Sequence, residues 1–146
     1  MFKALITSGI LFFLSTTPIY ADHADDLVIG NKIAAKVGRY TMAVDAFEQQ
    51  LNHLGGKFRA TKVHLKIIKQ WTPKLMQKIG KHRSKHEIQG PLNVVNIHNK
   101  LVLVSFYREA KGKNMGEIKQ ALHFMERVMT NIRLDIVQQY GLHIAL

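Results

Sequence analysis

Two long stretches of this chain place their apolar residues at alternating spacings of three and four, and this pattern constrains the fold more than any other feature. Such spacing gathers the apolar side chains on one face of an α-helix. In the first stretch, from about residue 26 to 54, the stripe is Ile33, Val37, Tyr40, Val44, Phe47, Leu51 and Leu54. In the second, from about residue 115 to 140, it is Met115, Ile118, Leu122, Met125, Met129, Ile132, Ile136 and Tyr140. The sequence therefore predicts two long amphipathic helices.

The chain between these helices shows a different pattern. Residues 61–68 alternate between apolar and polar side chains, which is the period of a half-buried strand. Residues 92–97 and 101–107 are typical of a hairpin, and the second of them is apolar on both faces, as a central strand would be. Thr72-Pro73 predicts the start of a short helix that ends at Gly80, and residues 81–90 predict an exposed loop.

The resulting prediction is a single α+β domain over residues 22–146. Its small sheet has at least three strands, at about 61–68, 92–97 and 101–107, and two long helices, at about 26–54 and 115–140, pack on it. A mostly helical fold, in which residues 58–70 are helical too, is the alternative. The heptad-like stripes also leave open pairing of the two helices or oligomerisation through them.

The first 21 residues have the pattern of a secretory signal peptide. Lys3 is followed by an uncharged apolar run over residues 4–14, and then by the helix-breaking Pro18 and a small residue at Ala21. We expect cleavage before Asp22 and a periplasmic or secreted protein; an uncleaved anchor is the alternative, although the run is short for a membrane span. The chain contains no cysteine, which fits an exported bacterial domain that is built without disulfides.

The strongest functional signal is a block of positive charge. The whole chain carries a formal net charge of +11, and no acidic residue lies between Glu48 and Glu87. The block consists of Lys57, Arg59, Lys62, Lys66, Lys69, Lys74, Lys78, Lys81, Arg83 and Lys85, with Trp71 among them. A run of one sign attracts polyanions, and an aromatic ring beside cations is an arrangement used at membrane interfaces and in base stacking. These eleven residues are the predicted anion-binding site.

Other chemistry is weakly indicated. His82 and His86 flank Ser84 at a spacing that could chelate a metal on a helix, but the surrounding cations oppose it. Once the leader is removed, His23 would lie next to a free amino terminus, which is a weak copper motif. No nucleophile elbow, catalytic carboxylate pair or phosphate-binding glycine loop is present. We therefore predict no cofactor, no metal and no catalytic residue.

The hypothesis that follows is an exported, non-catalytic binding or adaptor module that engages an anionic partner through residues 57–85. The expected partner is an anionic membrane surface, an envelope polymer or an acidic protein, with nucleic acid less favoured. Two alternatives remain. One is an exported enzyme or toxin with a site near residues 81–90, and the other is a structural subunit that oligomerises through its long helices.

Overall fold

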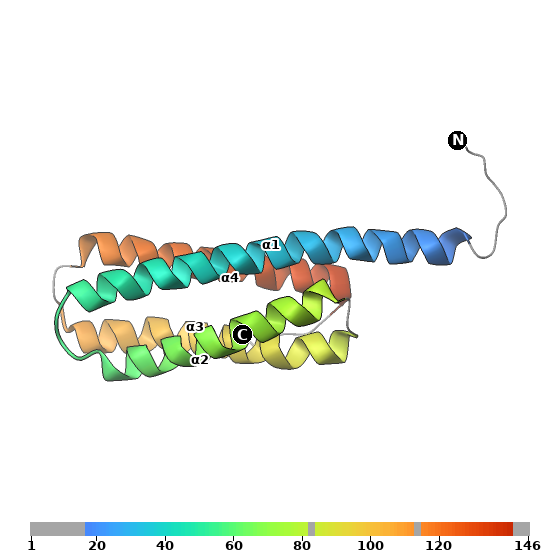
Figure 1. The fold of residues 1–146 in the computed structure, drawn as a ribbon. Coiled ribbons are helices and arrows are strands. Elements are labelled where there is room, and N and C mark those ends of the chain that lie inside the picture. The colour runs from blue at the N-terminus through green and yellow to red at the C-terminus, as the bar shows by residue number, and fades with distance from the viewer. Residues whose placement is uncertain (1–16, 82–83, 113–114, 142–146) are drawn as a thin grey trace.

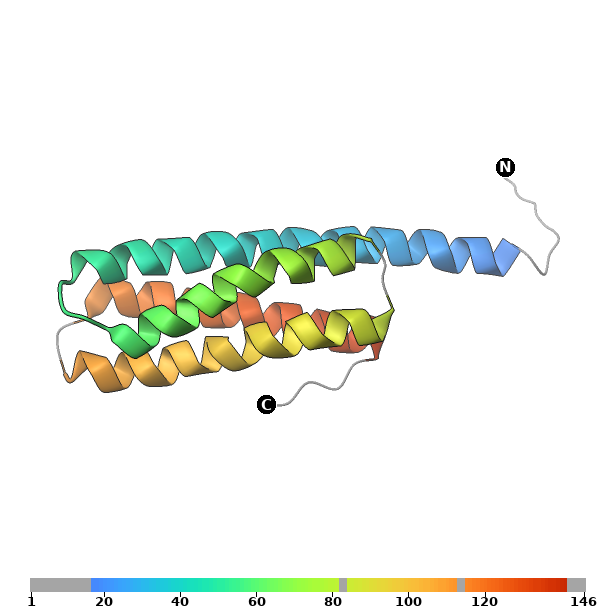
Figure 2. The same ribbon diagram turned by 60° about the horizontal axis from the view of Figure 1, so that its bottom comes forward.

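Four antiparallel helices in sequence order form the fold of the computed structural model, which describes residues 17–81, 84–112 and 115–141 (Figure 1). They are α1 (Thr17–His53), α2 (Arg59–Gly80), α3 (Lys85–Ala110) and α4 (Gly116–Tyr140). Each helix packs against its two neighbours around the bundle, so that α1 contacts α2 and α4, and α3 contacts the same two. The amino-terminal part of α1 extends beyond the other helices (Figures 1 and 2).

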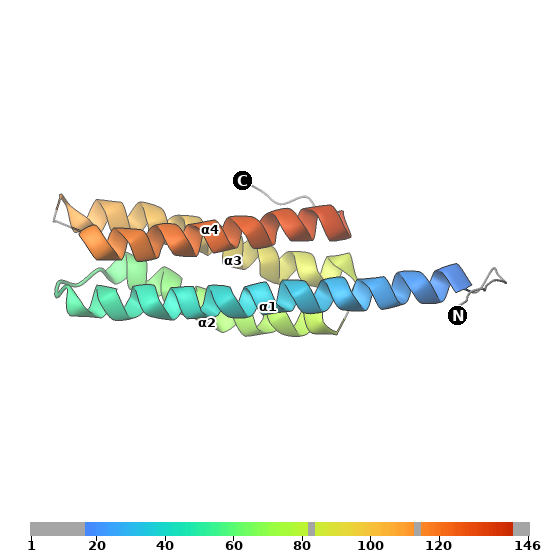
Figure 3. The ribbon, with the colours of Figure 1, turned by 90° about the horizontal axis from the view of Figure 1, so that it is seen from above.

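The two predicted long helices are present as α1 and α4, which lie side by side (Figure 3). Both stripes face the interior: Val37, Phe47, Leu122 and Ile136 are all buried, and in the first stripe only Leu54, which follows α1, is exposed. Because the stripe residues are buried in the chain's own core, they are not accessible for contacts with a second copy of the chain. The predicted cleavage point between residues 21 and 22 falls within α1, while residues 1–16 of the leader lie outside the described part.

The predicted strand at 61–68 is wrong, because the helix α2 covers it. The predicted short helix is present as the last part of α2, which ends at Gly80 as predicted but begins at Arg59 rather than at Thr72. The buried side chains of α2 recur at spacings of four and three and include two threonines that a hydropathy pattern counts as polar. They are Thr61, Leu65, Ile68, Thr72, Leu75 and Ile79. The helix also continues through Pro73, and the Thr72 hydroxyl donates to the Ile68 carbonyl oxygen at 2.5 Å. The alternation at 61–68 was misleading because it assigned Val63 to the core, whereas this side chain is exposed.

The predicted hairpin at 92–107 and the predicted loop at 81–90 are also wrong, since α3 occupies most of both. Two buried asparagines, Asn96 and Asn99, interrupt the apolar stripe of this helix and hide its period. The Tyr40 hydroxyl of α1 donates to Asn99 Oδ1 at 2.7 Å, across the interior of the bundle. This contact supplies the partner that a buried amide needs, and burial raises the pKa of Tyr40 far above its ordinary value. No strand occurs in the described residues, so the fold is all-α rather than α+β.

Aromatic rings fix the end of the bundle where α2 begins. Phe106 of α3 lies edge-to-face on Phe47 of α1, with ring centroids 5.4 Å apart, and stacks on Phe58 at 5.7 Å. Phe58 precedes α2 and has a φ of +40°, a left-handed conformation that side-chain-bearing residues seldom adopt. Its burial against Phe106 fixes the turn that directs α2 back along α1.

Candidate functional site

Most of the basic block lies on the outer half of α2. The buried residues of this helix occupy one side, and the cations fill the remaining positions: Arg59, Lys62, Lys66, Lys69 and Lys74 are exposed, and Lys78 is half-buried. Lys57 and Lys81 are exposed just before and just after the helix. Arg83 and the side chain of Lys85 are outside the described part of the structure. The helix thus carries six of the predicted cations, and two more lie just outside its ends, a more compact arrangement than the expected strand, helix and loop.

Two of these cations form ion pairs with acidic residues of neighbouring helices. Lys69 Nζ lies 2.6 Å from Glu48 Oε1 and 4.0 Å from Asp45 Oδ1 on α1, and the hydrogen bond to Glu48 raises the pKa of Lys69. Lys78 Nζ lies 3.4 Å from Glu87 Oε1 on α3. The other block cations make no ion pair among the described residues. Arg59, Lys62, Lys66 and Lys74 therefore provide the positive potential that is left over for a ligand.

A shallow hollow follows the α1–α2 boundary beside these cations. Its lining consists of Glu48, Lys62, Lys66, Lys69 and Gln70, and its volume is about 400 Å³. Three of the five lining residues are lysines, and the single carboxylate is already paired with Lys69. The hollow is suited to an anionic group of modest size.

Trp71 lies on the opposite flank of α2, toward α3. Its indole is half-buried and packs against the core, and Lys74 Nζ lies 4.3 Å from the ring centroid. The ring is therefore both a packing residue and part of the surface that carries the cations. The sequence had left these two interpretations as alternatives.

An exposed apolar stripe lies on α3, next to the basic helix, and the sequence analysis missed it. Ile97, Leu101 and Val104 follow one another at spacings of four and three, with exposures of 44%, 37% and 58%. On α2, Val63 is also exposed. The assignment of residues 92–107 to a hairpin had placed these side chains in a sheet core. Figure 2 shows α2 and α3 as neighbours, so the helix that carries the apolar stripe lies next to the helix that carries the cations.

The boundary between α2 and α3 contains a carboxylate that caps α2. Glu109, in the last turn of α3, accepts hydrogen bonds from the backbone N–H groups of Ala60 and Thr61, both at 3.0 Å, and from the Thr61 hydroxyl at 2.6 Å. The two backbone N–H groups are among the donors at the start of a helix that have no partner within the helix. Burial opposes ionisation of Glu109, but the hydrogen bonds from Thr61 and Ala60 outweigh it and lower its pKa. The residue that precedes α2 makes no side-chain capping hydrogen bond, so a residue of the neighbouring helix α3 caps α2 instead.

Two histidines meet further along the same boundary. His64 of α2 and His98 of α3 are both half-buried, and their Nδ1 atoms lie 3.0 Å apart. The ring centroids are 5.1 Å apart and the ring planes are inclined at 38°. Burial, together with the positive charge that His64 can carry, lowers the pKa of His98. Neither residue stood out in the sequence, because 34 positions separate them, and His64 was predicted in a strand and His98 in the turn of the hairpin.

The region that the enzyme alternative invoked contains no assembled catalytic group among its described residues. Ser84 is exposed and precedes α3, and its hydroxyl lies 3.3 Å from Glu87 Oε2. Ser105 is buried and donates to the Leu101 carbonyl oxygen at 2.6 Å, so it is a structural residue of α3. His82 lies outside the described residues, as does the side chain of His23.

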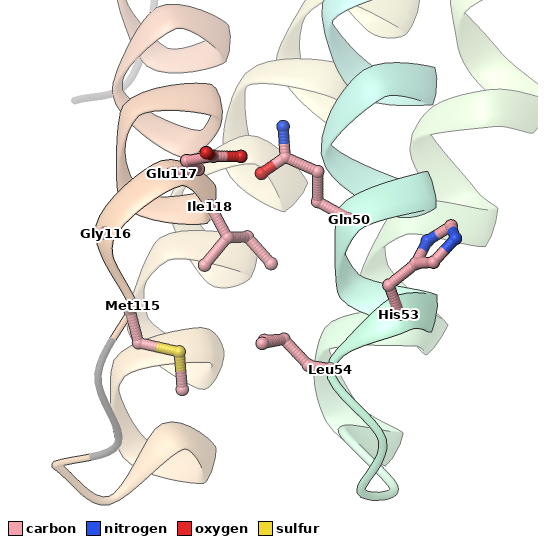
Figure 4. Close-up of a pocket in the computed structure, with 7 residues that line it drawn as sticks. All are labelled: Gln50, His53, Leu54, Met115, Gly116, Glu117 and Ile118. Atoms are coloured by element: carbon pink, nitrogen blue, oxygen red, sulfur yellow. The ribbon is translucent and has the colours of Figure 1, made fainter.

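A cavity of about 320 Å³ lies at the other end of the bundle, where α1 ends and α4 begins (Figure 4). Gln50 and Glu117 point toward each other across it, while the imidazole of His53 turns away from that carboxylate (Figure 4). His53 Nδ1 lies 2.7 Å from the Gln49 carbonyl oxygen instead. The histidine and the carboxylate therefore do not form an acid–base pair here.

Within the described ranges, no group of three or more histidine, aspartate or glutamate residues is arranged to hold a metal ion. None of the helices, as far as they are described, combines the length and apolarity that crossing a bilayer requires. Comparisons with protein-family models, curated proteins and solved structures found no match.

Proposed function

We propose that this chain is an exported, non-catalytic module that binds peripherally to an anionic membrane surface through the side formed by α2 and α3. The observation that supports this most directly is that α2 carries a row of cations with no ion pair among the described residues, while the neighbouring helix α3 carries the exposed apolar stripe Ile97, Leu101 and Val104. Cations attract acidic headgroups, and exposed apolar side chains gain free energy on entering the interfacial region. Trp71 with its stacked Lys74 adds an amphipathic ring of the kind that membrane interfaces favour.

The composition of the block favours a diffuse surface over a single recognised group. Eight of its ten cations are lysines, whose compact charges do not form the bidentate fork that arginine offers to one phosphate. A lipid surface presents many equivalent anionic groups, which such a row of charges can meet in several registers. An envelope polymer or a nucleic acid would use the same cations but would gain little from the exposed aliphatic stripe.

The charge contribution is tested with two variants that lower the net charge equally. The site variant carries Lys62→Gln, Lys66→Gln and Lys74→Gln; the control carries Lys32→Gln, Arg39→Gln and Lys119→Gln, which are exposed positions on α1 and α4. Each lysine near an anionic surface contributes about 1 kcal/mol, so we expect the site variant to bind phosphatidylglycerol-containing vesicles about 100-fold more weakly. The control should lose less than tenfold. Equal losses in both variants would mean that only net charge matters, and the proposed site would be refuted.

The apolar contribution distinguishes a lipid surface from a soluble polyanion. The double variant Ile97→Ser/Val104→Ser leaves every charge in place and removes the exposed stripe. We expect it to weaken vesicle binding and to leave binding to long-chain polyphosphate unchanged. Vesicle binding that is insensitive to these changes would argue for a purely electrostatic partner such as an envelope polymer.

A further inference from the structure

We propose that His64 and His98 form a two-imidazole binding site for a divalent late transition metal, with Cu²⁺ bound most tightly. The inference rests on the placement of their Nδ1 atoms, 3.0 Å apart across the α2–α3 boundary. Sequence spacing gave no indication of this pair, and it is separate from the cations on the outer half of α2.

The distance suits two ligands of one metal ion. Imidazole nitrogens bind such metals at about 2.0–2.1 Å, so two of them at right angles lie about 2.9 Å apart, and at a tetrahedral angle about 3.3 Å apart. The observed separation lies between these values, close to the right-angle geometry that square-planar and tetragonal Cu²⁺ prefers. At this distance one Nδ1 can donate a hydrogen bond to the other, and rotation of the rings about their side-chain torsions is needed to turn both Nδ1 lone pairs toward one metal ion.

The helices hold the two rings in register. Thr61, one turn before His64, donates to Glu109, and its hydroxyl lies 3.1 Å from Ser105 Oγ, so α2 and α3 are tied together close to the pair. When the two ligands are already held close together, little conformational entropy is lost as the metal binds. Because both rings are half-buried, solvent can supply the remaining ligands as water.

The local charge is compatible with a cation, although the chain as a whole is basic. Most lysines of α2 occupy its outer half, whereas the pair lies on the flank that faces α3, where the charge of Lys78 is paired with Glu87. The residues one turn away from each histidine are all uncharged. They are Ala60, Thr61, Ile67 and Ile68 on α2, and Val94, Val95, Leu101 and Val102 on α3.

The test measures Cu²⁺ binding to the purified chain by isothermal titration calorimetry at low chloride and pH 7.5, with electron paramagnetic resonance of the bound ion. We expect one site with two coordinated nitrogens. His64→Gln and His98→Gln should each weaken binding at least tenfold, and the double variant should abolish it. The control His53→Gln/His86→Gln removes two exposed imidazoles from other places and should bind as the parent does.

Zn²⁺ gives a second readout that does not depend on copper. In the parent, saturating Zn²⁺ should raise the melting temperature, because an ion that binds only the folded state stabilises it. Neither single variant should show this rise, and circular dichroism verifies that each is folded. Undiminished Cu²⁺ binding in the double variant would place the metal elsewhere, for example at the amino terminus, and would refute the proposal. Loss of binding in the control but not in the site variants would refute it as well.

Discussion

Glu109 provides the sharpest test of how this bundle is held together, because one carboxylate of α3 satisfies three donors at the start of α2. Replacement by alanine leaves the two backbone N–H groups and the Thr61 hydroxyl without this acceptor. A lost helix cap costs about 0.5–2 kcal/mol, and a hydrogen bond to a charged group contributes about 1.5–3 kcal/mol. Because water can reach part of this site, we expect Glu109→Ala to lower the free energy of unfolding by about 2 kcal/mol. For a chain of this size that lowers the melting temperature by about 8 °C.

The pH dependence of the same variant series isolates the charge. The pKa of Glu109 is lowered below its ordinary value of 4.5 in the folded state, so its ionised form stabilises the fold above that pH. This stabilisation is lost as the pH falls through the lower, folded pKa. We expect Glu109→Gln, which keeps one acceptor oxygen, to cost about 1 kcal/mol at pH 7, and the difference from the parent to shrink below pH 4.5.

Urea unfolding, followed by circular dichroism at several pH values, measures both quantities. Glu117→Gln is the matched control, since Glu117 also lies in the first turn of a helix but is exposed. It should change stability by less than about 0.5 kcal/mol. The reasoning is refuted if Glu109→Gln costs no more than the control, or if its cost is the same at pH 3 and at pH 7.

Two further predictions concern α1. Gly38 lies inside this helix, and a Cβ atom there would lie 3.6 Å from the flexible end of Met76, which is ordinary van der Waals contact. Because alanine has a higher helix propensity than glycine, Gly38→Ala should stabilise the protein by about 0.5–1 kcal/mol. A lower melting temperature of this variant would contradict the described packing. The leader pattern predicts that the exported protein begins at Asp22. The intact mass of the protein recovered from the periplasm or the medium should therefore correspond to residues 22–146. A membrane-bound product that still carries Met1–Ala21 would contradict this prediction.

Sequence patterns found α1 and α4 because their stripes are continuous and apolar. Every position from Ile33 to Leu51 on the first stripe carries an apolar or aromatic residue, so the helical period is visible without knowledge of the partners. The glycines at 55, 56 and 141 adopt positive φ where these helices end, which is the conformation that glycine commonly supplies at a helix C-terminus. The block of cations was likewise evident from the sequence, since charge and the absence of counter-ions are properties of composition.

The two middle helices could not be assigned in this way, because their stripes contain polar residues whose burial depends on partners far along the chain. Thr61 is buried on account of Glu109 and Ser105, and Asn99 on account of Tyr40. Read alone, such residues break the helical period, and the remaining valines, leucines and isoleucines imitate a strand. Short-range propensity is weak compared with these contacts.

For the candidate sites, too, some features follow from local sequence patterns and others arise only from the packing of the helices. The order of the residues alone shows that 57–85 is a dense run of positive charge. The docking of the helices places most of these cations on one helix, pairs Lys69 and Lys78 with acids of α1 and α3, and leaves an apolar stripe exposed on the neighbouring helix. The same holds for the pair His64 and His98, whose Nδ1 atoms are brought together by the packing of α2 against α3. Local patterns record which face of a segment is apolar, whereas contacts between distant residues arise only when the helices dock.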